Sequence, residues 1–405
     1  MTVVAAPRPT RGPRFSSRQH DDENAAWLGL ALGVCFTICF VTGVVSHLVQ
    51  DPGSWFHWPA RPAGLYRLNQ GLHVTTGIAA IPLLLTKLWV VFPKLFAWPP
   101  FRSVAQAVER LALLPLVGAS LFLLVTGVGN VNIWRPYEFS FRTGHYAAAW
   151  IVVGALVVHV GARWATTRDV LTRRLGGATT ATTATTAPVE SPEASDRTPD
   201  EGATPASGLS RRAFLGTTAA ASGALVLFTV GQTVAPLRHL AFLAPRRPDR
   251  GPQGFPVNRT AASVGLTEVD LAAYRLEVVG DGVSRPLSLS YDDLRSLPQR
   301  EATLPIACVE GWSTNQRWRG VPVRDLLALA GARDGAEATV VALHDNPRQR
   351  TSPLSSAQAA DPDTLLALDV GGDVLAPDHG FPVRLIGPNR PGVQQTKWVA
   401  RLEVT

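Results

Sequence analysis

The chain has 405 residues, which is enough for two or three domains with separate cores. Hydrophobic residues make up 46% of it and charged residues only 17%. A soluble domain carries about a quarter charged residues, so this composition argues against an entirely soluble protein and indicates membrane segments. The net charge of +7 includes many arginines beside apolar runs and no basic, aromatic stripe, so we expect no nucleic-acid partner.

Four apolar segments fill the first 165 residues, and each has about the 20 residues that a helix needs to cross the hydrocarbon core. They are residues 25–49, 68–92, 111–131 and 146–164. Arginine and lysine gather before the first segment, between the second and third, and after the fourth. The positive-inside rule therefore predicts a cytoplasmic tail at 1–24 and a four-helix membrane domain at 25–165 whose two ends are cytoplasmic.

The next part of the chain changes character twice. Residues 166–209 are rich in Thr, Ala, Pro and acidic residues without an apolar period, which predicts a disordered cytoplasmic linker. A fifth apolar run follows, and we expect residues 210–235 to form an anchor helix that leads out of the cytoplasm. A Pro- and Arg-rich stalk at 236–256 then precedes a globular part at 257–405.

The start of the fifth run resembles a twin-arginine export signal. Its sequence is Ser-Arg-Arg-Ala-Phe-Leu at 210–215, followed by an Ala-rich apolar stretch. That export route carries folded domains with their cofactors, so the resemblance implies that a cofactor is inserted before export. The alternative is an ordinary positive flank of a membrane helix. The chain shows no convincing small-residue cleavage site, so we expect the segment to remain as an anchor.

Residues 257–405 carry the signals of an α+β domain with one core. Strands are predicted where apolar residues alternate or cluster, at 274–280, 339–343, 382–386 and 398–404. Ser290 and Asp293 form a capping box that opens a short helix. Pro322 and Gly331 bracket a second helix at 323–330.

Cysteine use singles out one thiol. Cys35 and Cys39 lie in the first apolar run, which leaves Cys308 alone in the last 240 or so residues. A lone cysteine in an exported domain cannot form an intramolecular disulfide, so it needs another reason to be there. The alternative is a buried, inert small hydrophobe.

Two sequence blocks resemble the oxidoreductase molybdopterin-binding domain of the sulfite-oxidase superfamily. The first is Leu-Pro-Ile-Ala-Cys-Val-Glu-Gly-Trp-Ser at 304–313, followed by Trp-Arg-Gly-Val-Pro-Val at 318–323. The second is His-Gly-Phe-Pro-Val-Arg-Leu-Ile at 379–386, ending at Lys397 and Trp398. The resemblance implies a Mo-molybdopterin cofactor whose metal takes the Cys308 thiolate, a soft ligand at the domain's edge. It also implies that His379, Arg384 and Lys397 hold the pterin phosphate.

The chain departs from sulfite oxidases in two respects. Their cysteine precedes an arginine-rich turn that helps to hold sulfite, whereas Glu310 and Trp312 stand here, and a carboxylate would repel sulfite. The sequence also ends without the dimerisation domain that sulfite oxidases add. In both respects it is more similar to the periplasmic methionine sulfoxide reductase and its relatives, which work with a separate haem-containing membrane subunit.

Histidines at the predicted spans suggest a haem, because intramembrane ionisable side chains are functional candidates. His145 and His159 are 14 residues apart, close to four helical turns or about 21 Å, which is the spacing of di-haem cytochrome b helices. The second span offers His73 at the outer level, but Lys87 at the inner one. His47 also lies at the outer level and could replace either partner there.

These positions predict one b-type haem near the outer face, held by His73 and His145, with His159 as a further candidate. Met1 is the only methionine, so methionine ligation is excluded. The membrane part weakly resembles membrane cytochrome b subunits. The alternative is that these histidines are interfacial or hydrogen-bonding side chains.

The function that we predict is electron exchange between quinone or quinol in a prokaryotic plasma membrane and an extracytoplasmic molybdenum centre. The first choice is a reductase of a small S- or N-oxide substrate. One alternative is a sulfite-type dehydrogenase that feeds electrons to the membrane. Another is a non-catalytic electron-transfer subunit with an empty pterin site.

Overall fold

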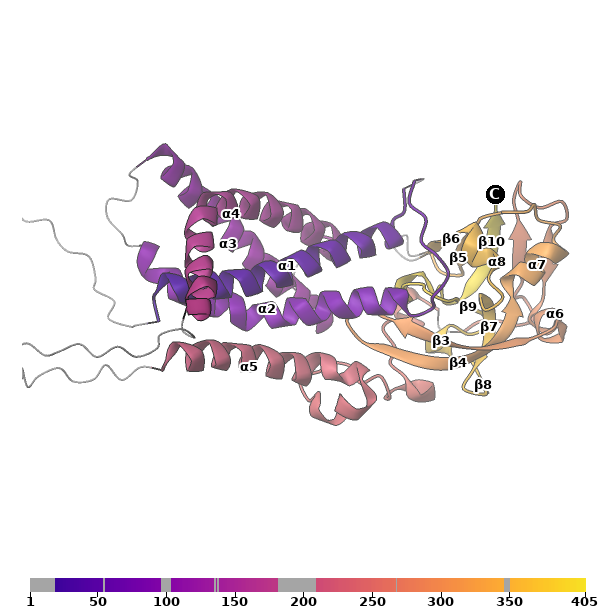
Figure 1. The fold of residues 1–405 in the computed structure, drawn as a ribbon. Helices are drawn as coiled ribbons and strands as arrows, with labels where there is room; N and C mark the ends of the chain where they lie inside the picture. The colour runs from indigo at the N-terminus through magenta and orange to yellow at the C-terminus, as the bar shows by residue number, and fades with distance from the viewer. Residues whose placement is uncertain are drawn as a thin grey trace, which may run out of the picture. The chain divides into compact units, whose positions relative to one another are not determined.

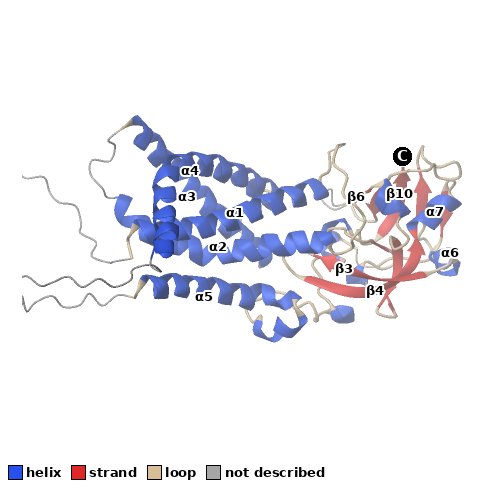
Figure 2. Cartoon of the chain, in the orientation of Figure 1, coloured by secondary structure: helices blue, strands red, loops and turns tan. Residues whose placement is uncertain are grey.

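The structure is a computed structural model, and it describes residues 19–53, 55–95, 103–134, 136, 138–180, 209–266, 268–345 and 350–405. Long helices make up the N-terminal half and most strands lie in the C-terminal third (Figures 1 and 2). Most of the predicted tail, 1–18, and most of the predicted linker, 181–208, lie outside the described residues, and the domain boundaries remain predictions.

Five helices are long and apolar enough to cross a membrane. They are α1 (Asp22–Gln50), α2 (Leu65–Leu95), α3 (Val104–Val131), α4 (Phe141–Thr180) and α5 (Arg211–Val230). They coincide with the five predicted apolar segments and confirm them. Helix α4 continues to Thr180, so residues 166–180, which we assigned to a disordered linker, are helical. No proline occurs in this stretch before Pro188, so nothing there breaks the helix.

The chain divides into two compact units, which we describe separately. The first consists of Met1–Phe36, Ala79–Val125 and Ala147–Gly223, and the second of Thr37–Ile78, Thr126–Tyr146 and Ala224–Thr405. Each long helix therefore contributes one end to each unit. The second unit joins the C-terminal domain to one end of every long helix.

In the first unit, α5 packs against α1 and α2. Phe214 and Leu215 lie against a buried cluster that includes Leu28 and Val90. The Ser222 hydroxyl donates a hydrogen bond of 3.0 Å to the carbonyl of Ala79. Arg211, at the start of α5, forms ion pairs with two carboxylates near the start of the first unit, Asp21 at 2.9 Å and Glu23 at 2.6 Å.

The C-terminal domain contains two five-stranded sheets. The first has the order β2-β1-β10-β5-β6, with β1 Leu276–Val279, β2 Leu287–Leu289, β5 Ala338–Ala342, β6 Thr351–Leu354 and β10 Val399–Val404. The second has the order β3-β4-β7-β8 with β9 on β7, and its strands are β3 Arg300–Ala307, β4 Ser313–Pro322, β7 Leu365–Val370, β8 Asp373–Val374 and β9 Arg384–Ile386. Three short helices accompany them, α6 (Tyr291–Ser296), α7 (Val323–Leu329) and α8 (Ser356–Ala360). This arrangement confirms the α+β prediction.

Local sequence signals account for several of these elements. The Ser290 hydroxyl accepts a hydrogen bond from Asp293 N at 3.1 Å, and the Asp293 carboxylate accepts one from Ser290 N at 2.9 Å, so the capping box is formed. Helix α7 ends just before Gly331, which has φ +62°, as expected of a left-handed residue after a helix. The predicted strands 339–343 and 398–404 are neighbours, β5 and β10.

Within the second unit, the helix ends and the α1–α2 connection contact the C-terminal domain through one residue in particular. The side chain of Asn389 accepts a hydrogen bond from Tyr66 N at 2.6 Å and donates one to Pro59 O at 2.6 Å. Its own carbonyl accepts a bond of 3.0 Å from Trp58 Nε1. Asn389 is buried, so these bonds are shielded from water and fix the two parts of this unit together.

Candidate active site

Cys308 lies in the tight turn between β3 and β4, as the sequence predicted. Cys308 N donates to Trp312 O at 3.0 Å, and Gly311 N donates to Cys308 O at 3.1 Å. Gly311 has φ +86°, and a Cβ there would lie 3.0 Å from Cγ1 of Val74 on α2. The turn therefore needs glycine for its backbone conformation and for its close approach to α2. Cys308 is only 2% exposed and packs in a buried cluster with Ile306 and Trp312, so the expectation of a sulfur at the domain's edge is corrected.

The Cys308 sulfur has two donors and one nearby carboxylate. Asn258 Nδ2 donates to Sγ at 2.8 Å, and Glu310 N does so at 3.4 Å. Burial, and after it the charge of Glu310, raises the pKa of Cys308 to about 12. The Glu310 carboxylate accepts a hydrogen bond from Trp312 Nε1 at 3.3 Å. A thiolate at this position therefore needs a positive partner, which a coordinated metal ion supplies.

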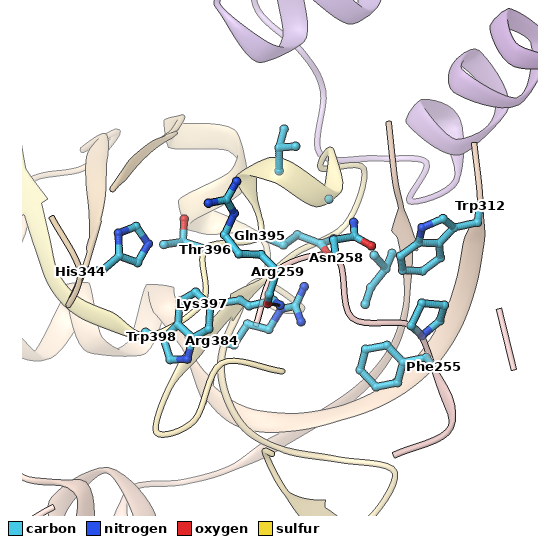
Figure 3. A pocket seen from close by; sticks show the side chains of 14 residues that line it. Phe255, Asn258, Arg259, Trp312, His344, Arg384, Gln395, Thr396, Lys397 and Trp398 are labelled. Atoms are coloured by element: carbon cyan, nitrogen blue, oxygen red, sulfur yellow. Dashed lines mark hydrogen bonds between the residues drawn. The ribbon is translucent and has the colours of Figure 1, made fainter. Parts of the chain in front are cut away.

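A pocket opens beside this turn, and the residues that line it come from several distant segments (Figure 3). Asn258, Ile306 and Trp312 connect it to the surroundings of Cys308. Three cationic residues line it, Arg259, Arg384 and Lys397. The pocket thus combines a thiol neighbourhood with cations, which suits a ligand that is anionic at one end.

Two of these cations, the buried Arg384 and the half-buried Lys397, form no ion pair with a carboxylate in the described part of the chain. Lys397 Nζ donates to the carbonyls of Arg259 and Asp378 at 2.8 and 2.6 Å, and burial, with Arg384 second, lowers its pKa to about 7. Arg384 donates to His379 O at 3.1 Å, and burial lowers its pKa to about 10. Arg384 Nε is buried and finds no hydrogen-bond partner among the described residues. A bound anion would stabilise both charges.

His379 takes a different place from the one expected of a phosphate-binding cation. Its ring stacks on Phe255 with centroids 3.7 Å apart, and Nδ1 lies 3.0 Å from Gln253 Oε1. Burial, followed by the charges of Arg384 and Lys397, lowers the pKa of His379 to about 3, so the ring is neutral. Its Nε2 is buried and has no partner among the described residues. The ring is not part of the pocket lining, so His379 supports Arg384 through its carbonyl.

Sequence reasoning missed several residues of this pocket. Phe255, Asn258 and Arg259 lie at or near the end of the predicted stalk, and His344 follows a predicted strand. Asn258 is 50 residues from Cys308 in the sequence, so no local motif connects them. The available signal was weaker: the composition turns globular at about residue 257, which marks where packed structure begins.

The membrane histidines fall into a pair and two separate residues. His73 and His145, both in the second unit, have ring centroids 6.2 Å apart. His73 Nδ1 lies 2.9 Å from Cys39 O, and His145 Nδ1 lies 3.0 Å from Thr126 Oγ1. With Nδ1 occupied in both rings, Nε2 is the nitrogen that each offers to a metal.

The other two histidines are held elsewhere. His47 stacks on Tyr146 with centroids 3.9 Å apart and an angle of 9° between the rings. His159 belongs to the first unit, and its Nδ1 has no partner among the described residues. Lys87 also belongs to that unit and donates to the carbonyl of Ala25. The structure therefore brings together His73 and His145 but does not add His47 to them.

Comparison with known proteins identifies the C-terminal domain. Residues 263–405 match the family model of the oxidoreductase molybdopterin binding domain. Over 138 residues, the chain is 34% identical to the uncharacterized oxidoreductase YuiH of Bacillus subtilis, covering 34% of this chain and 67% of that protein. The chain belongs to the oxidoreductase molybdopterin-binding family. The resemblance noted in the sequence is thereby confirmed, and Mo-molybdopterin is the cofactor of such a domain.

The match covers a smaller share of two other relatives. Mitochondrial sulfite oxidase of Mus musculus is 31% identical over 207 residues, which are 42% of this chain and 38% of that protein. A putative protein-methionine-sulfoxide reductase subunit, YedZ1 of Azospira oryzae, is 36% identical over 151 residues, 37% of this chain and 56% of that protein. The chain thus spans about two fifths to just over half of the length of these relatives.

Proposed function

We propose that this chain is a membrane-bound, molybdopterin-dependent oxidoreductase in which Cys308 supplies the protein thiolate to molybdenum. The observation that carries the proposal is the position of the Cys308 sulfur. It is buried, it accepts a hydrogen bond from Asn258 Nδ2 at 2.8 Å, and it adjoins a pocket lined by Arg384 and Lys397, which form no ion pair among the described residues. A soft sulfur ligand next to an anion-binding pocket matches the two ends of a molybdopterin.

The residues around the pocket fit such a cofactor in charge as well as in ligand type. Arg384 and Lys397 would hold its phosphate, because burial lowers the pKa of each and neither forms an ion pair with a carboxylate among the described residues. Asn258 would orient the Cys308 sulfur and stabilise its negative charge. When bound, the molybdenum centre supplies oxygen-atom transfer coupled to two electrons. The chain's own part is to bind the cofactor, to hold the thiolate and to shape the entrance.

The substrate that we propose is a small, uncharged S- or N-oxide. Glu310 is two residues from Cys308 and buried, and its carboxylate is oriented by Trp312. Glu310 does not line the pocket of Figure 3, but burial and, after it, the Glu310 charge raise the pKa of the adjacent Cys308. That charge would likewise disfavour an anion such as sulfite beside the sulfur and tolerate a neutral oxide. The pocket also offers apolar walls, Phe255 and Ile306, and amide groups, Asn258 and Gln395, that could donate to an oxide oxygen. The carboxylate disfavours the sulfite-type dehydrogenase, which remains the alternative direction.

The electron partner that we propose is a b-type haem ligated by His73 and His145. Metal–imidazole bonds are about 2.0 Å long, so one metal ion would be held by both rings if their centres lay roughly 6 Å apart. The observed separation of 6.2 Å fits this value. A Cβ at Gly43 would lie 3.1 Å from His73 Cε1 and one at Gly127 would lie 3.7 Å from His145 Cε1, so glycine keeps space beside both rings.

The location that we propose is a prokaryotic plasma membrane, with five spans and the molybdopterin domain on the extracytoplasmic side. Five apolar helices and the distribution of arginines support this orientation. Quinone or quinol is then the natural electron carrier in the membrane. The paired Arg211 and Arg212 support export of the domain after cofactor insertion.

Metal and pterin analysis of the full chain, purified in detergent and combined with a haem spectrum, tests this function. The proposal predicts one molybdenum, one molybdopterin and one b-type haem per chain. A chain that contains haem but neither molybdenum nor pterin would support the non-catalytic electron-transfer subunit instead. Absence of all three groups would overturn both functions.

A further inference from the structure

The turn that carries Cys308 is held by two membrane helices at a single backbone atom. The carbonyl oxygen of Val309 accepts hydrogen bonds from Asn130 Nδ2 on α3 at 3.1 Å and from Gln70 Nε2 on α2 at 3.4 Å. Both amide side chains belong to largely buried residues, with 4% and 7% of their surfaces exposed. A carbonyl oxygen has two lone pairs, so these two donors satisfy it completely.

The same two helices also carry the surroundings of the histidine pair. Gln70 precedes His73 by three residues, less than one turn of α2. Asn130 follows Thr126 by one turn of α3, so the regular helical bond joins Asn130 N to Thr126 O. The Thr126 hydroxyl in turn lies 3.0 Å from Nδ1 of His145. All of these residues belong to the second compact unit.

A continuous connection therefore runs from the thiol to the imidazole. It passes from Cys308 through its peptide bond to Val309 O, across the hydrogen bond to Asn130, and along α3 to Thr126 and His145. Electron tunnelling through covalent and hydrogen bonds decays less steeply than tunnelling across gaps. A Cβ at position 311 would lie 3.0 Å from Val74 Cγ1, so the turn approaches α2 closely at Gly311.

We propose that Asn130 and Thr126 form the electronic bridge between the two redox centres, with Gln70 holding Val309 in register. The inference rests on the proposed function. In the reductase direction, each transfer moves one electron from ferrous haem to the oxidised molybdenum centre, and two transfers serve one oxide reduction. Quinol is the electron source, and no bond within the bridge forms or breaks. Asn130, Thr126 and Gln70 are positioning residues, since none of them touches the substrate.

Flash photoreduction of the full chain in detergent tests the bridge without a substrate. A photochemical donor such as deazaflavin reduces the haem, and relaxation of the b-type band then reports electron transfer to molybdenum. In Asn130→Leu, which keeps the side-chain size but removes the donor, this relaxation slows, because tunnelling must then cross a gap in place of the hydrogen bond. Asn132→Leu is the matched control, because the Asn132 amide is exposed and bonds only to Val128 O in its own helix among the described residues.

Three further variants test which residues belong to the bridge. Thr126→Val removes the hydroxyl beside His145 and should slow the relaxation by a similar factor. Because the two residues act in series, the double variant Asn130→Leu/Thr126→Val should be little slower than either single one. Gln70→Met should have a smaller effect. If Asn130→Leu loses a cofactor, the Thr126→Val rate decides the question.

A readout that needs no cofactor completes the test. Hydrogen exchange of the backbone amides at 309–312 in cofactor-free protein should be faster in Asn130→Leu than in wild type, because the turn has lost a clamp. Wild-type relaxation in Asn130→Leu or in Thr126→Val, with haem and molybdenum both retained, overturns the bridge and leaves the proposed function intact. A wild-type chain without haem or without molybdenum overturns the proposed function itself.

Discussion

The two candidate redox centres of this chain are assembled in opposite ways. The pocket beside Cys308 collects side chains from segments as far apart as Phe255 and Trp398. His73 and His145, by contrast, lie on two long helices, and one nearby oxygen orients each ring: Cys39 O for His73 and Thr126 Oγ1 for His145. A single substitution that removes one lining residue should therefore weaken cofactor binding only in part, whereas loss of either histidine of the pair should abolish haem binding.

The two centres also differ in how their surroundings are charged. At the pocket, burial lowers the pKa values of Lys397 and Arg384, so a bound anion would stabilise the charged form of both side chains. Around the histidine pair, the partners named above are a hydroxyl and a carbonyl, which orient a ring without adding charge. One centre binds by electrostatics and the other by ligand geometry.

The largest effect should come from the thiol. Cys308→Ser replaces the soft ligand by a hydroxyl of similar size, so the fold should persist while turnover falls by well over about 100-fold, since even the loss of an outer partner of a metal ligand costs 10–100-fold. Activity per molybdenum is the measurement. Asn258→Ala, which removes only the donor to the sulfur, provides the graded control and should lose about 10–100-fold. Full activity in a molybdenum-containing Cys308→Ser protein would contradict the ligand assignment.

The histidine pair should respond in an all-or-none manner. His145→Ala removes one of two axial ligands and should abolish the b-type absorption band, whereas His159→Ala should leave most of it. His47→Ala tests the other candidate at the outer level, whose ring stacks on Tyr146; we expect this variant to leave most of the band. Loss of the band in His159→Ala, with His145→Ala unaffected, would show that the haem lies at the other level.

Export of the pocket, with its cofactor, is expected to depend on the guanidinium pair. Arg211→Lys/Arg212→Lys keeps the positive charge that membrane orientation requires and leaves Asp21 and Glu23 a cationic partner. We expect the C-terminal domain to remain inside, where protease added to spheroplasts cannot reach it. Normal export of this double variant would mean that charge-directed insertion suffices.

The smallest effect should be a pH dependence at the pocket. Lys397 has a pKa of about 7 in the structure, so its ammonium is present below that pH and lost above it. Molybdopterin binding to the cofactor-free chain should weaken by about tenfold or more above that pH, because a hydrogen bond to a charged group contributes roughly 1.5–3 kcal/mol. Pterin fluorescence measures this binding. The alkaline weakening should be absent in Lys397→Met, and its persistence there would assign it to another group.

The sequence predicted those parts of the molecule that depend on local signals. The capping box at Ser290, the glycine after α7 and the five apolar helices each rest on residues within one element. Strand β7 has six buried residues and no alternation, so its pattern could not distinguish a buried strand from a helix. The rotation of the membrane helices was equally undetermined, which is why His47 remained a candidate for the outer pair.

The residues of the candidate site likewise divide into those with a local sequence signal and those without one. Cys308, Arg384 and Lys397 lie in motifs and were predicted, although their roles remain proposals. The close approach of the Gly311 turn to α2 involves Val74, which is more than 200 residues away in the sequence, and the donor to the Cys308 sulfur is 50 residues away. Contacts of this kind are decided by tertiary packing, and no local pattern encodes them.

Electron flow between the two centres is the central claim, and one mixing experiment tests it most directly. The full chain in detergent is reduced until the b-type band is fully ferrous and is then mixed with methionine sulfoxide or trimethylamine N-oxide, without air. We predict that the band reoxidises in the wild-type protein but persists in Cys308→Ser protein with the same haem content. Equal reoxidation of both proteins, or reduction of the oxidised wild-type band by sulfite with no response to either oxide, would contradict the account.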